Sequence, residues 1–174
     1  CSLIHAPGIG YGASLGLDLP VNVRLLDTPP RREVRDPDGL LEAVLNAWKD
    51  AGHPAPAEEF HWAVRSNIPP RQGLKSSAAV AIAGLRALAD AANVEVSTAA
   101  LVELAGTAQL AAGVSMTGAY DDAWAAAEPG WRVVDVGATS AEERVVMEGK
   151  GLNPDDWRVL ILTGPEREKH PPVE

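Results

Sequence analysis

The segment Gly73-Leu74-Lys75-Ser76-Ser77-Ala78 has the composition of an anion-binding loop. A glycine lets the backbone approach a ligand closely, and the unpaired N–H groups at a helix N-terminus attract negative charge. The serine hydroxyls and the Lys75 ammonium group would add donors to a bound phosphate. The simpler alternative is that Ser76 or Ser77 only caps a helix while Lys75 is solvated, and the local sequence does not decide between the two.

A second candidate is the adjacent carboxylate pair Asp121-Asp122, within Thr117-Gly118-Ala119-Tyr120-Asp121-Asp122-Ala123. A carboxylate there could accept a proton or bind a cation. The alternative is a solvated turn, since aspartate is common in loops. Beside Tyr120 and Trp124, however, two carboxylates are costly unless a proton, a cation or a lysine compensates their charge. Lys75 is the natural compensator, which predicts a contact between Lys75 and the pair.

A glycine-rich segment near the N-terminus could also contact a small molecule. Gly8, Gly10, Gly12 and Gly16 recur there among small and apolar residues. Glycine allows backbone N–H groups to approach a ligand, but a tight turn between strands explains the spacing nearly as well.

The elements that must position these residues are a mixture of helices and strands. Helical spacing of apolar residues predicts helices at 40–51, 76–92 and 98–112, the second of them buried centrally, with Ser97 as an N-cap. Strands are expected at 1–4, 17–25, 60–64, 131–136 and 157–163, and a further strand at 123–127 would form a hairpin with 131–136. Loops are expected at 8–16, 27–39 and 114–122. This order lacks a regular βαβα alternation and predicts the α+β class.

Composition excludes several classes of protein. The chain has 174 residues and 46% apolar content, enough for a packed core. The net charge of −9 argues against a nucleic-acid partner or an anionic membrane surface. The single cysteine, Cys1, cannot form an internal disulfide, and the four histidines lack zinc-ligand spacing, so we expect a cytoplasmic protein. No apolar run approaches the roughly 18 residues of a membrane span.

Three motifs together resemble a known family. The order P-x-x-x-G-L-x-S-S-A-A from Pro69 to Ala79 resembles the phosphate loop of the GHMP kinases, the family of galactokinase, homoserine kinase and mevalonate kinase. The Gly-Leu-Lys-Ser-Ser variant is similar to that of the archaeal-type shikimate kinase branch. Residues 10–19 resemble the glycine-rich segment of that branch, and residues 117–123 resemble its Thr-Gly-Ala-aromatic-Asp-Asp-Ala motif.

The resemblance implies a two-lobed kinase whose N-terminal lobe is similar to ribosomal protein S5 domain 2. Residues 1–174 would form this N-terminal, ATP-binding lobe. No glycine-rich motif of the C-terminal lobe is recognised after Trp157, so we expect the chain to be incomplete at both ends. The partners implied are a small-molecule substrate and the C-terminal lobe of the same enzyme, and a homo-oligomer is left open.

The resemblance also implies an activity, the phosphorylation of the 3-hydroxyl of shikimate with ATP and Mg²⁺. Shikimate carries a carboxylate, which an arginine would meet. Arg24, Arg65 and Arg71 are the candidates. The roles implied are catalysis by Asp121 and Lys75, ATP binding by Gly73, Leu74, Lys75, Ser76, Ser77 and Ala78, Mg²⁺ binding by Ser77 and Asp122, and substrate binding by Gly10, Gly12, Asp122 and Arg71.

The sequence departs from the family pattern at two places. Arg71 and Gln72 stand where the family usually has small residues, and Gln109 and Leu110 stand where related kinases carry a magnesium-binding glutamate. Two alternatives therefore stay open: a GHMP kinase acting on homoserine or mevalonate, and a catalytically silent GHMP-like protein that senses a metabolite. An RNA-binding S5-like domain is disfavoured by the negative charge.

Overall fold

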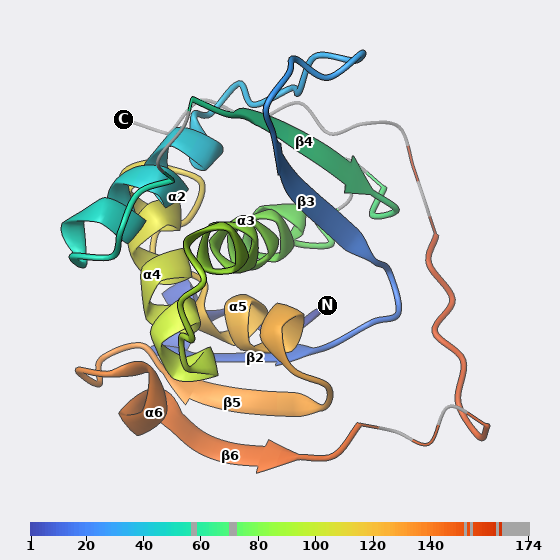
Figure 1. Ribbon diagram of the computed structural model, residues 1–174. Coiled ribbons are helices and arrows are strands. Elements are labelled where there is room, and N and C mark those ends of the chain that lie inside the picture. The colour runs from blue at the N-terminus through green and yellow to red at the C-terminus, as the bar shows by residue number, and fades with distance from the viewer. Residues whose placement is uncertain (57–58, 70–72, 152, 154, 163, 165–174) are drawn as a thin grey trace, which may run out of the picture.

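The fold is known from a computed structural model, which describes residues 1–174 except 57–58, 70–72, 152, 154, 163 and 165–174 (Figure 1). Its four-stranded antiparallel sheet has the order β1 (Ser2–Ile4), β2 (Tyr11–Leu15), β5 (Trp131–Asp135) and β6 (Val145–Gly149). A separate antiparallel pair consists of β3 (Val21–Leu26) and β4 (His61–Ser66). The helices are α1 (Ala6–Ile9), α2 (Leu40–Asp50), α3 (Ser76–Ala92), α4 (Thr98–Ala111), α5 (Tyr120–Ala127) and α6 (Ala141–Arg144).

Helix α3 is the centre of the core. It runs between the β3–β4 pair and α5, and it also packs against α2 and α4 (Figure 1). Small residues allow these close approaches: Ala81 is fully buried, and Gly84 faces Val44 and Trp62. Burial of Leu85 and Leu88 on the same helix adds apolar area removed from water, at about 25 cal/mol per Å². The predicted central helix is therefore confirmed.

Most of the other predicted elements are confirmed as well. Helices α2 and α4 fall within a residue or two of their predicted limits, and the Ser97 hydroxyl accepts a hydrogen bond from the Ala100 N–H as an N-cap. The strands expected near 1–4, 60–64 and 131–136 are β1, β4 and β5. The α+β class is confirmed. No helix in the described part of the chain is long and apolar enough to cross a membrane.

The prediction of a loop at 8–16 was wrong, because Tyr11–Leu15 is a strand between β1 and β5. The strand expected at 17–25 begins only at Val21. Two glycines of this segment, Gly12 and Gly16, mark close packing. A Cβ at Gly16 would lie 2.9 Å from the Ala125 carbonyl oxygen, where only a hydrogen atom fits.

The predicted hairpin around residues 128–130 was also wrong. Residues 123–127 belong to helix α5, whose alanine-rich surface packs on α3, α4 and β2, and β5 instead pairs with β2 and β6. The loop expected at 114–122 is therefore shorter, because Asp121 and Asp122 lie in the first turn of α5. Residues 157–162 form no strand, and Thr163 lies outside the described residues. Strand β6 and the short helices α1 and α6 were not predicted.

Candidate functional site

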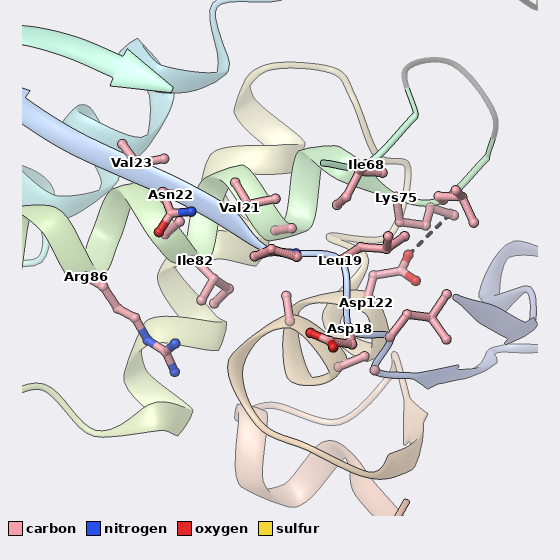
Figure 2. Close-up of a pocket in the computed structure, with 18 of the residues that line it drawn as sticks. Asp18, Leu19, Val21, Asn22, Val23, Ile68, Lys75, Ile82, Arg86 and Asp122 are labelled. Carbon is pink, nitrogen blue, oxygen red and sulfur yellow. Dashed lines mark ion pairs between the residues drawn. The ribbon is translucent and has the colours of Figure 1, made fainter. Parts of the chain in front are cut away.

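The predicted contact between Lys75 and the carboxylate pair is confirmed. Lys75 immediately precedes α3, Asp122 lies in the first turn of α5, and the Lys75 Nζ is 3.3 Å from the Asp122 Oδ2 (Figure 2). The Asp122 side chain is 2% exposed whereas that of Lys75 is 33% exposed. The pair thus joins a buried carboxylate to a cation that solvent and a ligand can still reach.

A serine on β2 bridges the two carboxylates. Ser14 is fully buried, and its Oγ lies 2.8 Å from the Asp121 Oδ2 and 2.7 Å from the Asp122 Oδ1. Ser2 donates a further hydrogen bond of 2.9 Å to the Asp122 Oδ1. Because a hydroxyl carries one hydrogen, Ser14 can donate to only one carboxylate at a time, and both contacts are hydrogen bonds only when one carboxyl group is protonated.

The surroundings of Asp121 favour the protonated form of its carboxyl group, because they raise its pKa. Burial raises the pKa of Asp121, and the neighbouring charge of Asp122 raises it further. The hydrogen bond from Ser14 and the positive charge of Lys75 act in the opposite direction. Asp122 has the closer cation, because the Lys75 Nζ lies 3.3 Å from its Oδ2.

Glycine at position 12 makes room for Asp121. A Cβ added to Gly12 would lie 2.8 Å from the Asp121 Cγ and 3.0 Å from each carboxyl oxygen. This contact explains why β2 has glycine at this point. The substrate-binding role predicted for Gly12 and Gly10 stays a prediction. Gly10 ends α1 with a φ of 78°, a left-handed conformation that favours glycine.

An exposed glycine, Gly73, precedes the start of α3, and the ATP-binding role predicted for residues 73–78 stays a prediction. Gly73 has a φ of 74°, and the N-cap residue is Lys75, with a φ of 56°. Neither serine is thus the N-cap. The Ser77 hydroxyl instead donates to the Gln109 Oε1 at 3.2 Å. Arg71, predicted to contact the substrate, lies outside the described residues.

Gln109 and Ser14 are two polar residues of the site to which the sequence analysis gave no role. Gln109, on α4, is fully buried, and its Nε2 donates to the Gly118 carbonyl oxygen at 3.0 Å. The sequence pointed to Gln109 only as a replacement for a glutamate. Ser14 was hidden in the glycine-rich segment, where no spacing signal separates it from the neighbouring small residues.

Two cavities adjoin the site and share Lys75 and Asp122. The larger, of about 420 Å³, extends along α3 beneath the segment that joins β2 to β3 (Figure 2). The smaller, of about 220 Å³, lies among α1, the start of α3 and the loop before α5. Its polar lining consists of Ser2, His5, Lys75, Ser77, Gln109, Ser115, Thr117, Asp121 and Asp122. Asp121 and Ser77 line the smaller cavity and not the larger one.

Of the arginines proposed to meet a substrate carboxylate, Arg24 and Arg65 are exposed on the β3–β4 pair and line neither cavity. The arginine that lines the larger cavity is Arg86, which sequence reasoning missed. It lies in the middle of α3, away from Lys75, and its Nη2 donates to the Ala127 carbonyl oxygen at 2.6 Å (Figure 2). Arg86 therefore supports the packing of α3 on α5 as well as lining the cavity.

The residues described contain no cluster of three or more histidine, cysteine or acidic side chains able to hold a metal ion. The smaller cavity nevertheless presents hard oxygen donors, the carboxylates of Asp121 and Asp122 and the hydroxyls of Ser77 and Thr117. Mg²⁺ prefers such donors, and it often takes only one or two carboxylates from the protein and the rest from phosphates and water. The chemistry of this donor set fits a magnesium–phosphate complex.

The chain is similar in sequence to a known protein family and to several curated proteins. The family described as GHMP kinases N terminal domain matches residues 39–130. The chain is 34% identical over 130 residues to a shikimate kinase of Thermococcus kodakarensis, covering 71% of this chain and 48% of that protein. It is 28% identical over 171 residues to a shikimate kinase of Pyrococcus abyssi, covering 92% of this chain and 59% of that protein.

A shorter match, to a shikimate kinase of Methanothrix thermoacetophila, is 45% identical over 71 residues, which are 41% of this chain and 25% of that protein. The chain thus spans about half the length of the first two relatives. No solved structure matches it significantly.

Proposed function

Because the chain belongs to the GHMP kinase family, we propose that it is the N-terminal, ATP-binding lobe of a shikimate kinase, which transfers the γ-phosphoryl group of ATP to the 3-hydroxyl of shikimate. The observation that carries the kinase chemistry is the buried Asp121–Asp122 pair, joined to Lys75 at the start of α3. The choice of acceptor follows the names of the relatives.

The reacting atoms belong in the smaller cavity on this proposal. Phosphoryl transfer requires a held phosphate, neutralisation of its charge and an aligned hydroxyl. The N-terminal N–H groups of α3 supply donors to a phosphate there, and Lys75 supplies a positive charge. Lys75 and Asp122 also line the larger cavity, which offers space for the part of ATP or of the acceptor that does not react.

Asp121 is the group that accepts the proton of the acceptor hydroxyl. To do so it must be ionised, although its burial disfavours the charge. Ser14 and Lys75 both stabilise the ionised form. A bound cation, or a substrate hydroxyl that donates to Asp121, would stabilise it further. Asp122 keeps Lys75 directed toward the cavity that Asp121 lines.

Mg²⁺ is the cation we propose for the site, with Ser77 and Asp122 as its protein ligands. When bound, it neutralises charge on the phosphates. Both residues line the smaller cavity with oxygen atoms that suit this ion. The Asp122 oxygens already accept from Ser14, Ser2 and Lys75, which fixes the carboxylate in one orientation. Gln109, a neutral amide, contributes no negative charge.

The test is ADP release by the full-length protein with ATP and Mg²⁺, offered shikimate, homoserine and mevalonate separately. We expect turnover with shikimate alone and its loss in Asp121→Asn, since removal of a general base typically costs about 10²–10⁴-fold. Turnover with homoserine or mevalonate alone would show that this alcohol, and not shikimate, is the acceptor. Binding of ATP or shikimate without turnover would favour the metabolite sensor instead.

A further inference from the structure

We propose that Gln109 is a positioning residue, whose side-chain amide clamps the start of α3 to the loop before α5 and so sets the distance between the phosphate loop and Asp121. The inference rests on the proposed kinase function. Gln109 lies on α4, an element that carries none of the residues predicted to bind or react. Its amide nevertheless touches both functional segments, Ser77 on one side and Gly118 on the other.

The two hydrogen bonds require an amide at this position. The Gly118 carbonyl oxygen can only accept, so the side-chain atom that faces it at 3.0 Å must be the donor Nε2. The Oε1 therefore faces Ser77, whose hydroxyl donates to it at 3.2 Å. A carboxylate would satisfy Ser77 and oppose the Gly118 carbonyl, whereas an apolar side chain would satisfy neither. Since Gln109 is fully buried, a donor or acceptor left unmatched at this position is costly.

The loop that Gln109 holds is under backbone constraint. Gly118 has a φ of 82°, and Ala119 has a φ of 49°, a left-handed conformation that costs a non-glycine residue energy. The backbone carbonyl of Gln109 also accepts from the N–H groups of Val114 and Ser115, at 3.1 and 3.3 Å. Gln109 thus contacts this loop at its beginning and at its end, which fixes the point where α5 starts.

A second residue of α4 acts on the same turn. Gly106, three residues before Gln109 and hence on the same face of the helix, lies against the Tyr120 ring, which a Cβ at Gly106 would approach to 2.3 Å. Tyr120 directly precedes Asp121, and the Arg144 guanidinium carbon lies 4.0 Å from the centroid of the same ring. Helix α4 therefore holds the start of α5 by one hydrogen bond and one packed ring.

The experiment compares Gln109→Glu and Gln109→Met with wild type in the full-length protein. Both variants keep the length of the side chain. The first keeps the acceptor for Ser77 and loses the donor to Gly118, and the second loses both. Leu110→Met, at the next and more exposed position of α4, is the matched control. The measurements are kcat, the KM for each substrate, the Mg²⁺ concentration at half-maximal rate, ATP affinity and thermal stability.

We expect kcat to fall in both variants, on the order of 100-fold for a misplacement near 1 Å, with the ATP affinity changed much less. A role confined to stability would lower the melting temperature and leave kcat of the folded fraction unchanged, which would overturn the proposal. So would a Gln109→Glu enzyme that keeps full kcat and needs less Mg²⁺, because position 109 would then serve a cation and not the loop.

Amide hydrogen exchange measures whether Gln109 holds the loop before α5, independently of turnover. Peptides covering residues 114–120 should exchange faster in Gln109→Met than in Leu110→Met, while peptides from the second half of α3 should be unchanged. Unchanged exchange in 114–120 would refute the clamp even if the protein proved inactive toward shikimate. Faster exchange in a protein with no kinase activity would leave the clamp standing and remove the proposed function.

Discussion

Replacing Asp121 with asparagine should stabilise the folded protein at neutral pH while it abolishes turnover. Ser14 offers one hydrogen to carboxyl oxygens that lie 2.8 Å away on Asp121 and 2.7 Å away on Asp122. When both groups are ionised, the Ser14 oxygen therefore faces one of the two carboxylate oxygens with no hydrogen atom between them. An asparagine amide at position 121 can donate to the Ser14 oxygen, and Ser14 can then donate to Asp122 without conflict.

The size of the effect follows from the missing hydrogen bond. A hydrogen bond to a charged group contributes about 1.5–3 kcal/mol to stability. For a domain of 150–250 residues, about 1 kcal/mol changes the melting temperature by about 2–4 °C. We therefore expect the melting temperature of Asp121→Asn to exceed that of wild type by at least about 2 °C at a pH where wild-type Asp121 is ionised.

The pH dependence provides the sharper test. Burial and the charge of Asp122 raise the pKa of Asp121 in the folded protein above the value of 3.8 expected without them. The folded state therefore holds the proton more tightly, and wild-type stability falls as the pH rises through the folded pKa. The advantage of Asp121→Asn should be greatest above the folded pKa and vanish below the unfolded one.

The assay is calorimetric unfolding in EDTA from about pH 3.5 to pH 8, with Asp122→Asn as the comparison. Asp122→Asn removes the negative partner of Lys75 and, with its carbonyl oxygen kept toward Ser2 and Ser14, turns its NH2 group toward the Lys75 ammonium group, so it should not share the gain. A melting temperature of Asp121→Asn below that of wild type at neutral pH, or a difference that does not vary with pH, would refute the account of proton sharing.

Two further substitutions test the geometry around this pair. Gly12→Ala should lower kcat at least about tenfold and destabilise the protein by about 1–3 kcal/mol, because its Cβ would meet the Asp121 carboxyl group at 2.8 Å. Gly8→Ala, where a Cβ meets nothing within 4 Å, should leave kcat and melting temperature near wild type. Lys75→Ala should lower kcat by about 10²-fold or more, change the Mg²⁺ dependence and lower stability by more than about 1 kcal/mol, because it leaves the buried Asp122 carboxylate without its cation. Unchanged activity and Mg²⁺ dependence in Lys75→Ala would show that its contact with Asp122 serves no step of the reaction.

The long helices and the ionic contact at the site could be predicted because their causes are local or chemical. Apolar spacing sets helices α2, α3 and α4, and Ser97 marks the start of α4. The contact between Lys75 and the aspartate pair followed from the cost of burying two adjacent carboxylates beside aromatic residues. No alignment of positions was needed for either inference.

The strand β2 could not be predicted because its residue types suit neighbours that are far away in the sequence. Gly12 is small because Asp121 lies against it, and Ser14 is polar because it faces a carboxylate pair more than 100 residues away in sequence. A strand composed of glycine, alanine and serine has no alternation of apolar and polar side chains, so it has the composition of a loop. The neighbours that explain these residues, Asp121 and Asp122, come close to β2 only in the folded chain.

The start of α5 was missed for a related reason, and it shows how the site is assembled. Lys75 and Ala119 both adopt left-handed backbone conformations, with φ values of 56° and 49°, and each directly precedes a helix that carries site residues. Such conformations cost a non-glycine residue about 1–2 kcal/mol, so local preference opposes both helix starts. They persist because tertiary contacts hold them, among them the hydrogen bond from Gln109 to Gly118. These two conformations thus mark the starts of both helices, of which only that of α3 was predicted, and the two starts bring Lys75 to within 3.3 Å of Asp122.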